Sequence, residues 1–81
     1  MENIIIKFDT IAQIKEFVDA IQPFPADFDL VHNRYIIDAK SIMGIFSMDL
    51  SKPLTLVVHS DSDVVKNQVK AELKRLNLLC D

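Results

Sequence analysis

The 81-residue chain has few of the residues on which common ligand sites and covalent cross-links depend. It contains one glycine, Gly44, so it lacks a glycine-rich loop that could cradle a phosphate group. Its one cysteine, Cys80, leaves no internal disulfide and no cysteine-based zinc site, and nothing calls for an oxidising compartment. We therefore expect neither a metal site nor a bound cofactor.

Long apolar runs and clusters of positive charge are also missing. No apolar stretch approaches the roughly 20 residues that span a bilayer, and Met1-Glu2-Asn3 offers no basic region typical of a signal peptide. The nine Lys and Arg residues form no dense cluster and the net charge is −3, which argues against a nucleic-acid surface. These features predict a cytoplasmic protein that neither binds nucleic acid nor inserts into a membrane.

The sequence does have enough apolar residues for a core. Hydrophobic residues make up 49% of the chain and charged residues 26%, as in an ordinary globular domain rather than a disordered segment. A chain of this length forms one domain, so we treat residues 1–81 as a single unit.

The spacing of the apolar residues predicts the secondary structure, because a period of two indicates a strand and a period of about 3.6 indicates a helix. Strands are expected at 3–8, 28–32, 35–39 and 54–59, and helices at 10–21, 41–48 and 62–76. The two-residue link Asn33-Arg34 predicts an antiparallel hairpin. The strand at 54–59 is almost wholly apolar, which favours a central position. The order predicts an α+β fold, a four-stranded antiparallel sheet with three helices on one face and water on the other.

Polar residues at the expected helix starts suit N-capping. The Thr10 hydroxyl can accept from the amide of Gln13, whose side chain can reach back in a capping box. Ser41 is placed to cap the short second helix, and Ser60 or Ser62 to cap the last one.

The most informative stretch is Lys40-Ser41-Ile42-Met43-Gly44-Ile45-Phe46-Ser47-Met48, which follows the expected hairpin and opens a short helix. It resembles the segment around the regulatory serine of HPr, the histidine-containing phosphocarrier family of the bacterial sugar phosphotransferase system. Phe17-Val18 lies at the family's usual distance from that serine, and residues 60–76 look like its last helix. The resemblance implies the HPr-like open-faced sandwich, with a role in sugar transport or carbon catabolite regulation.

The residues that carry phosphate in the family are replaced here. The resemblance puts Thr10 at the position of the active histidine, Ala12 at that of the arginine and Gln13 at that of the proline. An imidazole forms a labile phosphoramidate, whereas a threonine alcohol is a poor nucleophile without an adjacent base and its phosphoester is far less reactive. Neither His32 nor His59 matches the family position. We therefore expect no catalytic residue and no enzyme activity.

Ser41 has two compatible interpretations. As an N-cap it satisfies a free amide of the short helix. The resemblance adds a regulatory phosphorylation site for a kinase of the HPr kinase type, and a helix N-terminus favours the added negative charge. Ile42, Met43 and Phe46 match a surface that contacts partner proteins in HPr. Ile45 and Met48 are expected to fill the core instead, because the apolar side chains on two helical turns cannot all point inward.

Other polar groups carry a structural interpretation. His32 and His59 each end an expected strand without a second ligand at metal-binding spacing. The pairs Asp27 with Asp29, and Asp61 with Asp63, are read as loop or capping residues rather than acid–base pairs.

Three functions remain open. The first is a divergent HPr-like protein that binds partners of the phosphotransferase or regulator type and cannot relay phosphate through histidine. The others are an atypical phosphocarrier in sugar uptake and a stand-alone interaction module that kept only the fold.

Overall fold

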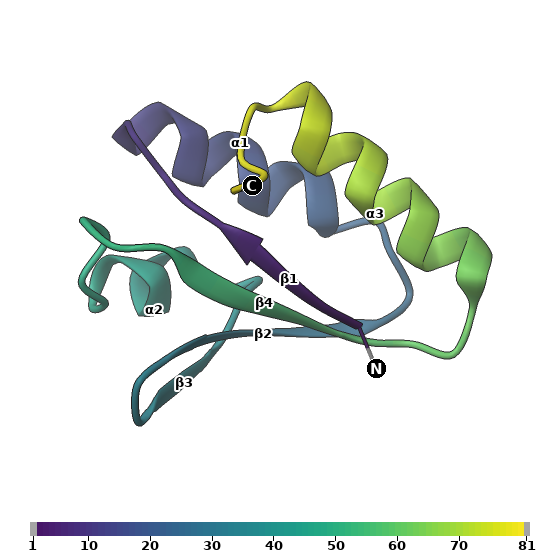
Figure 1. Ribbon diagram of the computed structural model, residues 1–81, viewed down its shortest axis with the longest axis horizontal. Helices are drawn as coiled ribbons and strands as arrows, with labels where there is room; N and C mark the ends of the chain where they lie inside the picture. The colour runs from purple at the N-terminus through teal and green to yellow at the C-terminus, as the bar shows by residue number, and fades with distance from the viewer. Residues whose placement is uncertain (1, 81) are drawn as a thin grey trace.

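The computed structural model describes residues 2–80 and has the expected α+β architecture. The elements follow in the order β1 (Glu2–Ile6), α1 (Ile11–Ile21), β2 (Asp27–His32), β3 (Tyr35–Asp38), α2 (Ile42–Phe46), β4 (Leu54–His59) and α3 (Asp63–Arg75). Figure 1 shows α1 and α3 above a twisted sheet, with α2 at the end of the molecule where α1 begins. The predicted fold class, a four-stranded antiparallel sheet with three helices in the order βαββαβα, is confirmed.

The sheet has the strand order β1-β4-β2-β3, with every neighbouring pair antiparallel. The predicted central position of the apolar strand β4 is confirmed, because β4 has a neighbouring strand on each side. Leu56 at its centre lies opposite Ile4 of β1 and Leu30 of β2. The predicted hairpin is formed by β2 and β3, and Asn33 in its turn has a positive φ of 55°.

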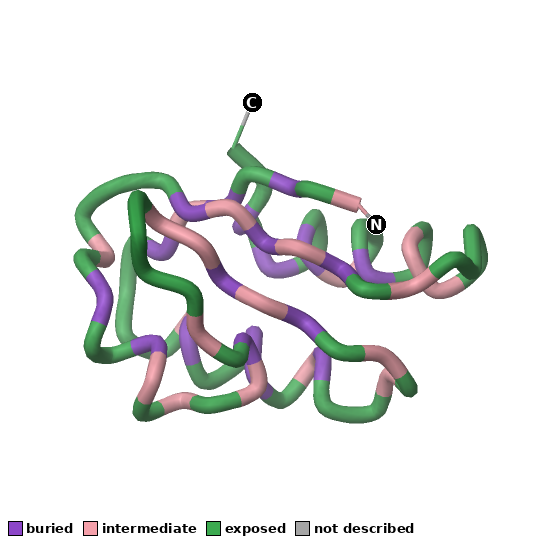
Figure 2. The backbone as a smooth tube through the Cα atoms, turned by 90° about the horizontal axis from the view of Figure 1, so that it is seen from below, coloured by how far each residue is buried: buried purple, intermediate pink, exposed green. Residues whose placement is uncertain are grey.

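One face of the sheet forms the core together with the helices. Alternate residues of β4 are buried, and alternate residues of β1 and β2 join them, as the period of two requires (Figure 2). From the helix layer come Ile14, Phe17, Val18, Ile21, Ile45, Val69 and Leu73. The Phe8 and Phe17 rings meet edge to face, with centroids 5.3 Å apart. Among residues 2–80 no buried polar side-chain atom lacks a hydrogen-bond partner.

The other face of the sheet is open. Its middle row runs across all four strands, since Ile5 lies opposite Thr55, Thr55 opposite Val31, and Val31 opposite Ile36. Directly opposed residues of antiparallel strands point to the same face, so this row, apolar except for the hydroxyl of Thr55, lies on the side away from the helices. The exposed fractions of Ile5 and Ile36 are 44% and 67%.

The segment after α3 adds a feature that the sequence did not predict. Asn77, with a positive φ of 62°, turns the chain so that residues 78–80 run along the outer edge of β1. The Lys7 N–H donates to the Leu78 carbonyl and the Cys80 N–H to the Ile5 carbonyl, both at 3.0 Å. The pairing of Ile6 with Leu79 therefore covers one edge of the sheet.

Several predicted boundaries were too generous. The first strand ends at Ile6, although Phe8 beyond it is buried, and α2 is a five-residue helix rather than the expected eight. Among residues 2–80 we find no helix with both the length and the apolar character to cross a membrane.

Candidate functional site

The helix α2 lies beside the hairpin and is held there from below by its apolar residues. Ile45 is fully buried and Met48 nearly so, which confirms that both fill the core. The chain just before α2 is tied to the end of α1, because the Lys40 ammonium donates to the Phe24 carbonyl at 2.9 Å and the Gln22 side chain donates to the Lys40 carbonyl at 3.1 Å. The Lys40 side chain is thus directed toward the segment after α1 and not toward Ser41.

Ser41 is the N-cap of α2, as predicted. Its backbone is extended (φ −97°, ψ 105°), and its hydroxyl accepts from the Gly44 N–H at 3.2 Å. Its own N–H donates to the Asp38 carbonyl at 3.0 Å, which fixes α2 to the end of β3. The residue is exposed, so its hydroxyl is open to solvent on the side away from the helix amides.

Two of the three predicted partner-binding residues are exposed. The exposed fraction of Met43 is 76% and that of Phe46 is 43%. The third, Ile42, is half-buried, because part of its side chain packs against the core. A helix of five residues presents one face to the sheet, and its remaining apolar side chains have no further layer to pack under. The result is an apolar surface made of Met43 and Phe46, next to the exposed Ser41, which we call the α2 surface.

Gly44 permits a close approach between α2 and the hairpin. A Cβ at this position would lie 3.3 Å from the Ser41 hydroxyl oxygen and 3.4 Å from the Cδ1 atom of Ile37. The first distance is short enough to disturb the capping hydroxyl, and the second is near van der Waals contact. The only glycine of the chain therefore stands where α2 meets both its own cap and β3.

Thr10, at the position that the resemblance gives to the active histidine, is the N-cap of α1. Its hydroxyl accepts from the Gln13 N–H at 3.2 Å, and the Gln13 side chain accepts from the Thr10 N–H at 3.0 Å. This confirms the predicted capping box. The Gln13 amide group also donates to the Leu76 carbonyl at 3.4 Å, which links the start of α1 to the end of α3.

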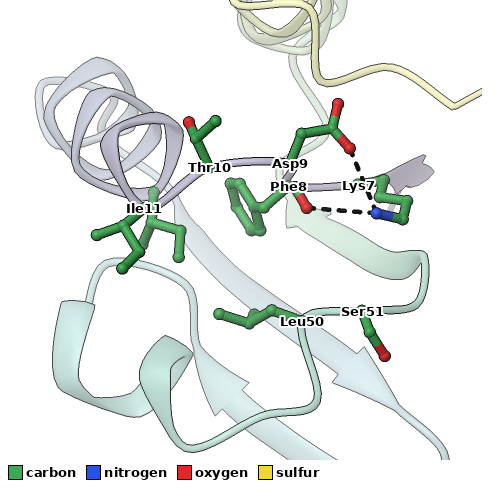
Figure 3. A pocket seen from close by; sticks show the side chains of 8 residues that line it. Lys7, Phe8, Asp9, Thr10, Ile11, Leu50 and Ser51 are labelled. Atoms are coloured by element: carbon green, nitrogen blue, oxygen red, sulfur yellow. Dashed lines mark hydrogen bonds and ion pairs between the residues drawn. The ribbon is translucent and has the colours of Figure 1, made fainter.

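A hollow of about 270 Å³ lies beside Thr10, between the start of α1 and the loop before β4 (Figure 3). Its lining is Lys7, Phe8, Asp9, Thr10, Ile11, Ile14, Leu50 and Ser51. The Lys7 ammonium pairs with the Asp9 carboxylate at 3.3 Å, and the Thr10 side chain points away from the hollow. The walls offer mostly apolar contact and no histidine, so the hollow has no group that would accept a phosphoryl group as an imidazole does.

The loop below the hollow is held by Asp49. The Ser51 hydroxyl and backbone N–H both donate to one Asp49 carboxylate oxygen, at 2.6 and 3.1 Å. These hydrogen bonds keep the pKa of Asp49 below its ordinary value of 3.8. The carboxylate is therefore charged at neutral pH and stabilises the turn.

The spacing of Ile11, Ile14, Phe17, Val18 and Ile21 predicts an apolar stripe along the first helix, but the exposed fraction of Ile11 is 73%. It is the first residue of α1, where the helix has not yet reached the sheet, and it lies on the rim of the hollow (Figure 3). Figure 1 places this end of α1 and the helix α2 at the same end of the molecule. The position of Ile11 directly after the N-cap Thr10 was the sequence signal that could have predicted its exposure.

The histidines lie apart from the α2 surface. The imidazole of His59 contacts the Asp29 carboxylate at 2.7 Å across the open sheet face, and His32 lies at the hairpin end of β2. Asp29 lies in β2, within the predicted strand 28–32, and pairs with His59, whereas Asp27, expected in the preceding loop, is the first residue of β2. Within residues 2–80 no three His, Cys, Asp or Glu side chains gather as metal ligands would.

Comparison with known proteins gave no relative: no protein-family model matches the chain, and no curated protein matches its sequence.

Proposed function

We propose that the chain is a divergent HPr-like protein of the bacterial cytoplasm, of the phosphotransferase or carbon-regulation type, that binds partner proteins through the α2 surface. The observation that carries the proposal is the arrangement of α2 itself. An exposed serine caps the helix, while Met43 and Phe46 stay exposed and Ile45 is the one fully buried residue of α2. Exposed apolar side chains beside a modifiable hydroxyl suit a contact surface whose affinity is set by charge.

The regulatory part of the proposal follows from the position of Ser41. A phosphoryl group there adds about two negative charges next to Met43 and Phe46. A partner that packs apolar side chains on this surface would lose affinity, whereas a partner that presents arginines would gain it. The fold itself should change little, because the exposed hydroxyl contacts only the first turn of α2.

The proposal excludes phosphate relay through histidine. The Thr10 hydroxyl caps α1, and no histidine lines the hollow beside it. An atypical phosphocarrier would need a different acceptor, and a stand-alone interaction module would need no kinase. Both are outcomes of the following test.

The test is incubation of the purified chain with HPr kinase and ATP, followed by intact-mass measurement. We expect the mass of one added phosphoryl group on the wild type and none on Ser41→Ala. Ser47→Ala is the matched control, since Ser47 lies at the other end of the same helix and should leave the modification intact. No mass increase with an active kinase would remove the regulatory role and leave Ser41 as a helix cap only.

A binding measurement tests the α2 surface separately. Titration calorimetry with a regulator of carbon catabolite control should give weaker binding for Met43→Ala and Phe46→Ala than for wild type. Val64→Ala serves as control, because Val64 is exposed to a similar extent but belongs to α3. Equal loss from all three variants would contradict a specific role of α2.

A further inference from the structure

The strand β3 is the open edge of the sheet. The opposite edge, at β1, is covered by residues 78–80, whereas within residues 2–80 no strand pairs with the outer side of β3. The strand reads Tyr35-Ile36-Ile37-Asp38 and carries neither the lysine nor the proline that commonly protects an edge. The exposed fractions of Tyr35 and Ile36 are 69% and 67%, the largest apolar exposure in the sheet.

The backbone groups that face outward can be assigned. The Ala39 N–H donates to the Phe28 carbonyl at 2.9 Å, so the residue pair 28–39 is hydrogen-bonded in the hairpin ladder. Hydrogen-bonded pairs alternate along an antiparallel ladder, which directs the N–H and C=O groups of Ile37 and Tyr35 toward β2. The N–H and C=O groups of Ile36 therefore point away from the sheet. The Asp38 carbonyl is already engaged by Ser41.

We propose that two copies of the chain associate through their β3 strands, antiparallel about a two-fold axis at Ile36, to form one continuous eight-stranded sheet. A two-fold axis perpendicular to the sheet keeps the open face of both copies on the same side, as a continuous sheet requires. Opposed residues must then share a face, which allows Ile36 opposite Ile36 and forbids Ile36 opposite Ile37. In this register the outward N–H and C=O groups of the two Ile36 residues bond to each other.

Charge complementarity supports a second copy as the occupant of this edge. Extended by one residue into the hairpin turn, the same register sets Arg34 of each copy opposite Asp38 of the other. Arg34 is exposed, and no ion pair to it is formed within the part of the chain described. Asp38 spends one carboxylate oxygen on the Lys40 N–H at 2.9 Å, and its other oxygen can accept from a guanidinium. Two such pairs would flank the central pair of isoleucines.

The open sheet face gives the dimer its apolar contact. The row from Ile5 through Thr55 and Val31 to Ile36 would continue into the same row of the second copy, so that the two exposed Ile36 side chains cover each other. On the helix side, Tyr35 lies opposite Ile37 of the second copy. Because the strand has four residues and the paired surface is small, we expect a weak dimer that forms at high micromolar concentration rather than a permanent one.

Sedimentation equilibrium of the full chain over about 10 µM to 1 mM tests the proposal. The apparent mass should rise from the 9.2 kDa of one chain toward twice that value. Ile36→Lys should abolish the rise, whereas Ile5→Lys, the same change at the far end of the same row, should leave it. Circular dichroism shows whether each variant is folded. A wild type that stays at 9.2 kDa up to 1 mM overturns the proposal and leaves the edge to a strand of another protein.

Charge reversal tests the register independently. Arg34→Asp alone and Asp38→Arg alone each set like charges opposite each other and should be monomeric. In an equimolar mixture, every Asp at position 34 or 38 of one chain faces an Arg of the other, so a heterodimer should form. Dimers of either variant alone, or no association in the mixture of the two folded variants, would rule out this register. The HPr kinase test is unaffected by these results, so the two proposals can fail separately.

Discussion

Removal of the Ser41 hydroxyl should destabilise the protein by a small and definable amount. The hydroxyl accepts one hydrogen bond, from the Gly44 N–H at 3.2 Å, and Ser41→Ala leaves that amide without its side-chain partner. Loss of a serine cap costs roughly 0.5–2 kcal/mol. The site is exposed, so water can replace the lost acceptor, and we expect about 1 kcal/mol. In a domain of this size that corresponds to about 4–8 °C in the unfolding temperature.

Thermal and urea unfolding followed by circular dichroism measure this loss, since the chain has no tryptophan for fluorescence. Ser41→Asp should retain most of the stability, because a carboxylate also accepts from the first-turn amides. Ser62→Ala removes the equivalent hydrogen bond of α3, in which the Val65 N–H donates to the Ser62 hydroxyl at 3.2 Å, and so gives the scale for a cap in this protein. If Ser41→Ala unfolds like the wild type while Ser62→Ala is destabilised, the capping role of Ser41 is refuted.

Three further outcomes are expected. Leu56→Ala on the core side of β4 should cost about 2–5 kcal/mol in urea unfolding, and Thr55→Ala on the open side about 1 kcal/mol or less; equal losses would contradict a one-sided core. The hydrogen bond and charge of Lys70 keep the pKa of Glu2 below its ordinary 4.5. Since the pKa of Glu2 is lower in the folded state, this stabilisation is present above pH 4.5 and is lost as the pH falls through the folded pKa. Glu2→Gln should therefore reduce the fall in the free energy of unfolding at acid pH, measured by urea unfolding. An unchanged pH dependence would contradict a stabilising Glu2–Lys70 ion pair. Phosphoenolpyruvate with the first enzyme of the phosphotransferase system should leave the intact mass unchanged, because Thr10 replaces the imidazole, and a stoichiometric phosphohistidine on either histidine would contradict this.

Sequence periodicity predicted the elements well because each one is reinforced by independent local signals. The first helix combines a capping box at Thr10 with apolar residues at helical spacing and a stop at Pro23. The strand β4 combines β-branched residues with flanking Pro53, and its apolar character follows from its central place. Local propensity and tertiary position agree at these elements, so short-range reasoning was sufficient.

The features that were missed depend on contacts between distant segments. Residues 78–80 contain no strand pattern of their own, and they pair with β1 only because Asn77 turns the chain back after α3. Ile11 fits the apolar stripe by spacing, yet its exposure depends on where α1 first touches the sheet, which periodicity does not encode. Asp29 falls in the predicted strand 28–32, but its contact with His59 depends on the β2–β4 register. The pattern of a single strand predicts which side chains point to the core, but the pairing register between two strands depends on the whole sheet.

The two proposed surfaces meet at Asp38, and this junction constrains how they can be tested. The Asp38 carbonyl accepts from the Ser41 N–H and its carboxylate from the Lys40 N–H, so Asp38 fixes the start of α2 as well as the end of the open edge. A variant at Asp38 therefore acts on both surfaces at once, whereas Ser41→Ala leaves both backbone bonds of the junction in place. Arg34→Asp changes the edge from the hairpin turn without touching α2. In Asp38→Arg, a complementary Arg34→Asp chain can restore the charge pairs across the edge, but it cannot repair damage to α2. If the mixture of the two variants associates, the loss of association in Asp38→Arg alone was therefore caused by the edge and not by the helix.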